Sequence, residues 1–182
     1  MLRKSLENKK VAMIVAFRDF RDEEYFIPKN VLERAGADIT TVSTSLGKAI
    51  GVGGGDIEVD VLLDNFSADS FDAVIFIGGG GALKYLDNEI SYNIAREAVS
   101  KNKTLAAICI APVILAKAGV LSGKKATVWS SPMERSPIRI LKQEGVIYQD
   151  NGVVVDNNII TAIGSVAAKE FGEAVIEVLT RG

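Results

Sequence analysis

The stretch Leu105-Ala-Ala-Ile-Cys-Ile-Ala-Pro-Val-Ile-Leu115 joins a buried strand to a helix through a cysteine. Its first half belongs to Thr104–Cys109, a continuous apolar run that is typical of a strand buried on both faces. Its second half opens Pro112–Leu121, where proline occupies the first turn of a predicted helix. A nucleophilic side chain between a strand and a helix is the setting of a nucleophile elbow. The stretch therefore predicts an α/β fold with a candidate site where this strand ends.

Similar apolar runs alternate with helical patterns along the rest of the chain, which predicts a parallel sheet with right-handed crossovers. We expect strands at Lys10–Ala16, Asp38–Thr44, Asp56–Leu63, Phe71–Ile77, Thr104–Cys109 and Ala126–Trp129. We expect helices at Tyr25–Ala35, Leu86–Asn102, Pro112–Leu121, Pro137–Glu144 and Val166–Thr180. Residues 47–55 are predicted as a turn, and residues 146–163 as a hairpin that turns at Asp150–Gly152 or at Asp156–Asn158. The prediction is one flavodoxin-like α/β/α sandwich over residues 1–182, with ligands bound at the carboxyl ends of the strands.

The composition is that of a soluble globular domain. The chain has 182 residues, 24% of them charged, and a net charge of −2. Lysine and arginine are scattered among the acids, which argues against a nucleic acid or an anionic membrane as partner. The first ten residues lack the apolar region of a signal peptide, and no apolar run approaches the roughly 18 residues of a membrane span. We therefore expect a cytoplasmic protein.

The chain contains no histidine and a single cysteine, Cys109. A Ser-His-Asp or Cys-His catalytic group cannot be built from it, nor can a His-rich zinc site. A general base must be Asp, Glu, Lys, Tyr or water, and we expect neither a metal nor a cofactor.

Cys109 has two possible roles on the evidence of its neighbours. Ala107 and Ala111 are small, as the close approach of strand and helix at an elbow requires. The N–H groups of the helix that follows would favour the thiolate, so the elbow interpretation predicts a lowered pKa. Alternatively, a cysteine among apolar residues is a small buried hydrophobe.

The run Phe76-Ile-Gly-Gly-Gly-Gly-Ala82 follows another predicted strand. Glycine N–H groups can converge on a phosphate, although the spacing matches neither a P-loop nor G-x-G-x-x-G. They can also form an oxyanion hole together with the Ile110 N–H, or the run is only a tight turn. A second run, Gly51-Val-Gly-Gly-Gly55, is predicted to be a flexible turn.

The acidic segment Arg21-Asp-Glu-Glu-Tyr-Phe-Ile-Pro28 lies where the first predicted strand gives way to a helix. A carboxylate here would lie at the same edge of the sheet as Cys109. The alternative is a solvated acidic helix start that complements the helix dipole.

Taken together, these segments resemble the PfpI/DJ-one superfamily, whose fold is similar to class I glutamine amidotransferases. Ala106-Ala-Ile-Cys-Ile-Ala-Pro112 resembles its elbow, A-I-C-[AH]-G-P. Glu24, four residues before Pro28, matches the active-site glutamate of its E-x-x-x-P segment, and Asp72-Ala-Val-Ile-Phe-Ile-Gly-Gly79 resembles its glycine loop. Gly36, Gly119–Gly123 and the hairpin also follow the family order.

The resemblance implies that Glu24 hydrogen-bonds to Cys109 and that Gly79 and Ile110 offer backbone N–H groups to an oxyanion. Members include proteases, glyoxalases, protein deglycases, redox-responsive protective proteins and catalytically silent relatives. They are generally homodimers or larger homo-oligomers, so the resemblance implies a homodimer or higher homo-oligomer for this chain too.

The chain departs from the family pattern at three positions. Ile110 replaces the histidine that follows the cysteine in PfpI-type proteases, and Ala111 replaces a glycine. Ser131 falls about where the parkinsonism-associated branch supplies a histidine, so it is at most an auxiliary residue. Without an imidazole, protease activity is not expected.

We therefore expect Cys109 and Glu24 to act on small electrophiles, as a cysteine-dependent hydrolase or lyase of the glyoxalase or deglycase type. The alternative is a non-catalytic, redox-sensing or stress-protective protein in which Cys109 is oxidised. A third possibility is an interaction scaffold with an inert cysteine.

Overall fold

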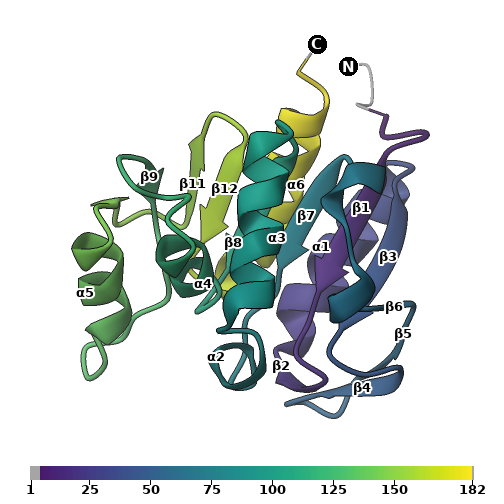
Figure 1. The fold of residues 1–182 in the computed structure, drawn as a ribbon, viewed down its shortest axis with the longest axis horizontal. Helices are drawn as coiled ribbons and strands as arrows, with labels where there is room; N and C mark the ends of the chain where they lie inside the picture. Colours follow the sequence, from purple (N-terminus) through teal and green to yellow (C-terminus); the bar gives the residue numbers. More distant parts are fainter. Residues whose placement is uncertain (1–4, 182) are drawn as a thin grey trace.

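A computed structural model describes residues 5–181, which fold around a seven-stranded sheet in the order β11-β12-β8-β7-β1-β3-β6 (Figure 1). Its strands are β1 (Lys10–Ile14), β3 (Asp38–Ser43), β6 (Val61–Leu62), β7 (Ala73–Phe76), β8 (Thr104–Ile108), β11 (Val153–Asp156) and β12 (Ile159–Ala162). All neighbouring strands pair in parallel except β11 and β12, which form an antiparallel hairpin. The predicted α/β fold with a mostly parallel sheet is confirmed.

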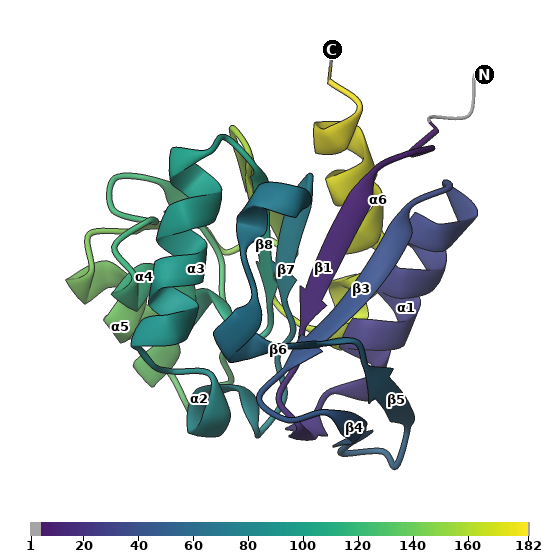
Figure 2. The same ribbon diagram turned by 45° about the vertical axis from the view of Figure 1, so that its right-hand side comes forward.

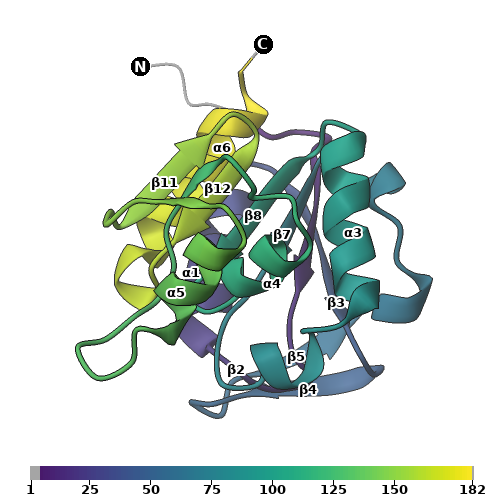
Figure 3. The ribbon, with the colours of Figure 1, turned by 60° about the vertical axis from the view of Figure 1, so that its left-hand side comes forward.

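Helices cover both faces of this sheet. On one face lie α1 (Asp22–Arg34) and α6 (Ala168–Leu179), which pack against each other. On the other lie α3 (Glu89–Ser100), α4 (Pro112–Lys117) and α5 (Ser136–Gln143), as Figures 2 and 3 show from two sides. Every residue of β7 and β8 is buried between the two layers, which explains why these strands read as unbroken apolar runs.

Two smaller sheets accompany the main one. The strands β2 (Arg18–Phe20), β4 (Gly47–Gly51) and β5 (Asp56–Val59) form one at the end where β1 finishes (Figure 1). The other pairs β9 (Lys125–Ala126) with β10 (Ile147–Tyr148). Short helices complete the chain: α2 (Ala82–Tyr85), η1 (Leu63–Asn65), η2 (Ala68–Ser70) and η3 (Ser165–Ala167).

Four predicted segments need correction. Residues 47–55 are not only a turn, because β4 pairs with both β2 and β5. The predicted strand Asp56–Leu63 is divided between two sheets at Asp60, whose carboxylate accepts a hydrogen bond from the Thr41 N–H at 2.7 Å. Of Ala126–Trp129, only Ala126 pairs in a strand. The hairpin predicted over residues 146–163 is shorter, because Ile147–Tyr148 pair with β9 in another sheet and only β11 and β12 pair with each other. Of its two alternative turns, Asp156–Asn158 is the correct one.

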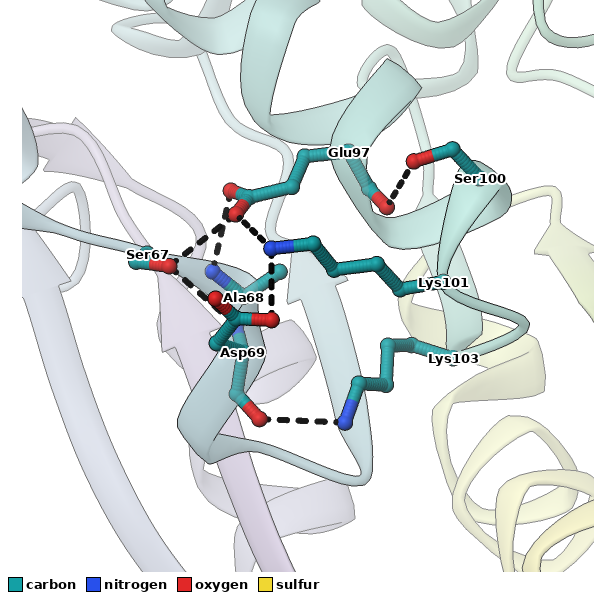
Figure 4. A network of polar contacts seen from close by, with 7 residues as sticks. All are labelled: Ser67, Ala68, Asp69, Glu97, Ser100, Lys101 and Lys103. Carbon is teal, nitrogen blue, oxygen red and sulfur yellow. Dashed lines mark hydrogen bonds and ion pairs between the residues drawn. The ribbon is translucent and has the colours of Figure 1, made fainter.

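A polar network fixes the connection that leads into β7 (Figure 4). The Glu97 carboxylate on α3 accepts hydrogen bonds from the Ser67 hydroxyl (3.0 Å), the Ala68 N–H (3.1 Å) and the Lys101 ammonium (2.7 Å). Lys103 donates to the Asp69 carbonyl at 3.1 Å. These bonds attach η2 to α3, so the network serves the fold at a distance from the candidate site.

Within residues 5–181, no helix has the length and apolar character needed to cross a membrane.

Candidate active site

Cys109 lies on a strained backbone directly after β8. Its φ is 64°, in the left-handed region that residues other than glycine rarely adopt. Two hydrogen bonds hold it there: its N–H donates to the Ala162 carbonyl, and its carbonyl accepts from the Trp129 N–H, both at 2.8 Å. This is the geometry of a nucleophile elbow, in which the strain turns the half-buried thiol away from the strand.

Glu24 reaches the same edge of the sheet from the first turn of α1. Its side chain is only 1% exposed. Oε1 accepts a hydrogen bond from the Ser165 hydroxyl at 3.4 Å, whereas Oε2 is buried without a well-formed hydrogen bond. A buried carboxyl oxygen without a full set of partners is unfavourable for folding, and such groups concentrate at functional sites.

Burial raises the pKa of Glu24 from 4.5 to about 7. The neighbouring Cys109 thiol, the positive charge of Arg21 and the Ser165 hydroxyl oppose this shift. A carboxyl with a pKa near neutral exists in both protonation states at pH 7, as a group that accepts and returns a proton must.

The pKa of the Cys109 thiol is raised, whereas a lowered pKa was predicted from the helix that follows it. Next to an ionised Glu24, burial and then the negative carboxylate raise the pKa of Cys109 to about 12, while the Ile110 and Gly79 N–H groups lower it. Because α4 spans only six residues, its amino end is too weak to outweigh burial and the carboxylate. Cys109 and Glu24 therefore titrate as one pair, which loses a first proton near pH 7 and a second far above.

The glycine run brings the elbow and the acidic segment together. A Cβ on Gly78 would lie 2.6 Å from both the Cys109 Cβ and the Glu24 Oε2. Gly79 has a φ of 110°, and its Cβ would lie 2.4 Å from the Arg21 nitrogen. The run is thus a close-packed turn. The Gly79 N–H and the Ile110 N–H both hydrogen-bond toward the sulfur, as an oxyanion hole requires. The second glycine run binds a carboxylate, because Asp22 accepts from the Gly53 and Gly55 N–H groups at 2.6 and 2.7 Å.

Cys109 lies where two cavities meet. The larger, of 570 Å³, is lined by the acidic side chains Glu23, Glu24 and Asp150 and by Tyr148. The smaller, of 290 Å³, is lined by Gly79, Gly80, Leu83 and Ile110. Arg21 and Trp129 line both.

Of the predicted site residues, the structure brings together Cys109, Glu24, Gly79 and Ile110. Ser131 lies outside this group. Its hydroxyl accepts a hydrogen bond from the Glu134 N–H at 3.0 Å, and Ser131 lines neither cavity. The sequence did not single out Ser165 or Arg21, although Arg21 directly follows β2 and Ser165 lies three residues after the end of β12. In the described part of the chain, no group of three or more Cys, Asp or Glu side chains is arranged to hold a metal.

The sequence profile of the DJ-1/PfpI family matches residues 9–178. This chain belongs to the DJ-1/PfpI family. It is 41% identical over 180 residues to an uncharacterized protein of Methanocaldococcus jannaschii, covering 98% of this chain and 86% of that one. It is 32% identical over 153 residues to a deglycase of Pyrococcus horikoshii, covering 84% of this chain and 89% of that one.

Two solved structures of the DJ-1/PfpI family superpose closely on the fold. The ThiJ/PfpI domain protein of Brachyspira murdochii has a TM-score of 0.88 and 32% identity, with 95% of this chain and 96% of that chain covered. Drosophila melanogaster DJ-1beta has a TM-score of 0.83 and 31% identity, with 96% and 91% covered.

The coupling of the two groups predicts how Cys109 reacts with iodoacetamide as pH changes. In the wild type, the alkylation rate should rise with a midpoint near pH 7, because the pair loses its first proton there and the thiolate forms when Glu24 takes the other. In Glu24→Gln the acceptor is gone and burial acts alone, so the midpoint should move above the ordinary thiol value of about 8.5. The adduct is counted by intact mass.

Glu23→Gln is the matched control, since Glu23 is an exposed carboxylate on the same helical turn. It should leave the midpoint near that of the wild type. A midpoint unmoved by Glu24→Gln would mean that the two groups do not share a proton.

Proposed function

We propose that this protein is a cysteine-dependent enzyme that converts α-oxoaldehydes, free or as adducts with amines and thiols, into α-hydroxy acids. The observation that carries the proposal is a buried carboxyl with a pKa of about 7 beside a cysteine at a strained elbow. A base of this pKa is matched to proton transfer at neutral pH. The relatives named deglycases support the same class of reaction.

The first step joins Cys109 to the aldehyde carbon. As the sulfur attacks, its proton passes to Glu24, and the aldehyde oxygen gains the negative charge of the breaking C=O π bond. The Gly79 and Ile110 N–H groups stabilise this oxyanion, since both already hydrogen-bond toward the sulfur. The oxyanion then recovers the proton from Glu24, and the product is a hemithioacetal.

Glu24 next moves a hydrogen between neighbouring carbons. It removes the proton from C1, the C–H electron pair forms the C1=C2 double bond, and the π pair of the C2 carbonyl moves onto the C2 oxygen, which takes up the proton of the C1 hydroxyl. As the C1 oxygen reforms a C=O bond, now that of a thioester, the double-bond pair takes the proton back from Glu24 at C2. C1 is thereby oxidised as C2 is reduced, and no external oxidant is needed. Water then releases the α-hydroxy acid and the free thiol. With an adduct, Glu24 first protonates the leaving amine or thiol and takes the proton of the C1 hydroxyl as the aldehyde forms.

Peptide hydrolysis is not proposed. Its poor amine leaving group needs a general acid, and the chain has no imidazole. An amine leaves a carbinolamine adduct before the thiol attacks and far more readily than it leaves a peptide bond, so Glu24 can serve the adduct, whereas in peptide hydrolysis it is engaged with the thiol.

Redox sensing by Cys109 is the second candidate. It is supported by the cavity openings on either side of the sulfur, which give peroxide access, and by the Gly79 and Ile110 N–H groups, which can hydrogen-bond to a sulfinate.

The proposal is tested with methylglyoxal in D₂O. We expect the pure protein to form lactate with deuterium at C2, because the proton carried by Glu24 exchanges with solvent. Protein pre-treated with iodoacetamide is the control, since Cys109 is the single cysteine and its alkylation should stop lactate formation. The products are identified by NMR.

Lactate that keeps the original aldehyde hydrogen at C2 would contradict the enediol step. No product from methylglyoxal or phenylglyoxal, together with peroxide oxidation of Cys109, would favour the redox function instead.

A further inference from the structure

Arg21 immediately precedes the acidic first turn of α1, to which Glu24 belongs. It lies between β2 and α1, and its backbone N–H donates to the Gly78 carbonyl at 3.0 Å, which fixes it against the glycine turn. Its side chain is exposed and, within residues 5–181, makes neither an ion pair nor a hydrogen bond. The neighbouring Asp22 is already bound by two glycine N–H groups. All five guanidinium donors are therefore available to a ligand.

The surroundings of Arg21 differ on the two sides of the sulfur. The larger cavity is also lined by Glu23, Glu24 and Asp150, so its acidic groups offset the Arg21 charge, which lowers the pKa of Glu24. The smaller cavity is lined otherwise by glycines, Cys109, Leu83, Ile110 and Trp129, so among the described residues Arg21 is its only charged side chain. An anion in the smaller cavity therefore meets no acidic side chain, and the planar guanidinium fork matches the shape of a carboxylate.

The smaller cavity also contains the face of the site on which an oxyanion forms. Gly79 and Ile110, whose N–H groups hydrogen-bond toward the sulfur, line this cavity and not the larger one. A bound aldehyde therefore turns its oxygen toward this side. The apolar Leu83 and Trp129 side chains suit the body of the same molecule, and Arg21 suits a negative group at its far end.

We infer that Arg21 is the specificity-determining residue of this site and binds a carboxylate on the substrate, so that the preferred substrates are α-oxoaldehydes that carry an acidic group. The inference rests on the proposed function, since it names the substrate class of that same reaction. The planar guanidinium of Arg21 can hold a carboxylate through two parallel hydrogen bonds. Binding leaves Cys109 free to attack the aldehyde at the other end of the molecule.

The test compares two aldehydes of nearly equal size, 4-carboxyphenylglyoxal and 4-methylphenylglyoxal, in initial-rate measurements of kcat and KM. The wild type should prefer the acid by about 10- to 100-fold in kcat/KM, mainly through KM, as expected for hydrogen bonds to a charged group. Arg21→Gln should abolish the preference for the acid, so that the two kcat/KM values become equal. Arg21→Lys should keep only part of the preference, because an ammonium cannot form the paired hydrogen bonds. Intact mass verifies that no arylglyoxal has modified an arginine during the measurement.

Arg18→Gln is the matched control. Arg18 is an exposed cation on the same segment, it rests over the Phe17 ring, and it lines neither cavity. This variant should keep the wild-type ratio. A wild type that turns over both aldehydes equally, or an Arg21→Gln variant that keeps the preference, would overturn the inference while leaving the proposed reaction intact.

A second measurement does not depend on turnover. Benzoate should slow the alkylation of Cys109 in the wild type but not in Arg21→Gln, and benzyl alcohol should protect neither. If no aldehyde is consumed but benzoate protects through Arg21, the proposed reaction fails and the anion site stands. If benzoate and benzyl alcohol behave alike in the wild type, the anion site itself is wrong.

Discussion

Cys109→Ala is expected to lower kcat/KM for methylglyoxal by at least about 10,000-fold, the scale on which removal of a nucleophile acts in other enzymes. The alanine keeps the Cβ, so the strained φ of 64° and the fold should be retained while the sulfur is lost. Glu24→Gln should lower kcat/KM by about 100- to 10,000-fold, the range for the loss of general acid–base catalysis. Lactate formation measures both effects, and thermal unfolding verifies that the variants fold.

The two losses should not add. Because Cys109 and Glu24 share one proton and act in successive steps on the same intermediate, the double variant should be no slower than Cys109→Ala alone. Glu24→Asp, which keeps the carboxylate on a shorter stem, should fall between Glu24→Gln and the wild type. Activity that survives Cys109→Ala would place the chemistry at another residue.

Gly81→Ala is expected to lower the free energy of unfolding by about 3 kcal/mol, the upper part of the range for an overpacked position. A Cβ at this position would lie 1.9 Å from the Arg18 carbonyl oxygen and 2.9 Å from the Ala16 Cβ. Backbone on one side and the buried Ala16 side chain on the other leave no flexible atom to move. Either β2 must separate from the glycine turn or the turn must distort, and both would displace Arg21 and Glu24.

Gly80→Ala is the matched control for this substitution. Gly80 is the preceding residue in the same turn, it is exposed, and no atom lies within 4 Å of its Cβ position. Its stability should change by no more than about 0.5 kcal/mol, as for an ordinary surface position. Urea denaturation of the two variants makes the comparison. Equal stabilities would show that β2 packs less tightly on the turn than the structure has it.

Much of the fold was predictable from single residues and short runs. The unbroken apolar runs of β7 and β8 identify central strands, because a strand covered on both faces has no polar side. Short pairings were not predictable. Residues Gly47–Gly51 have the composition of a turn, and they become β4 only because β2 and β5 lie on either side of them.

The sequence by itself determined the α/β class, the positions of Cys109 and Glu24 at the carboxyl edge of the sheet, and the exclusion of histidine chemistry. These conclusions follow from the residue types and from the order of the predicted strands, both of which can be recognised in short stretches of sequence. Only the tertiary structure decided the protonation of the pair, since the pKa of Glu24 depends on how deeply α1, the glycine turn and the elbow bury it. It also decided that Ser165 and Arg21 belong to the site and that Ser131 does not. Burial and electrostatic interaction arise between segments far apart in the chain, so no short stretch of sequence contains them.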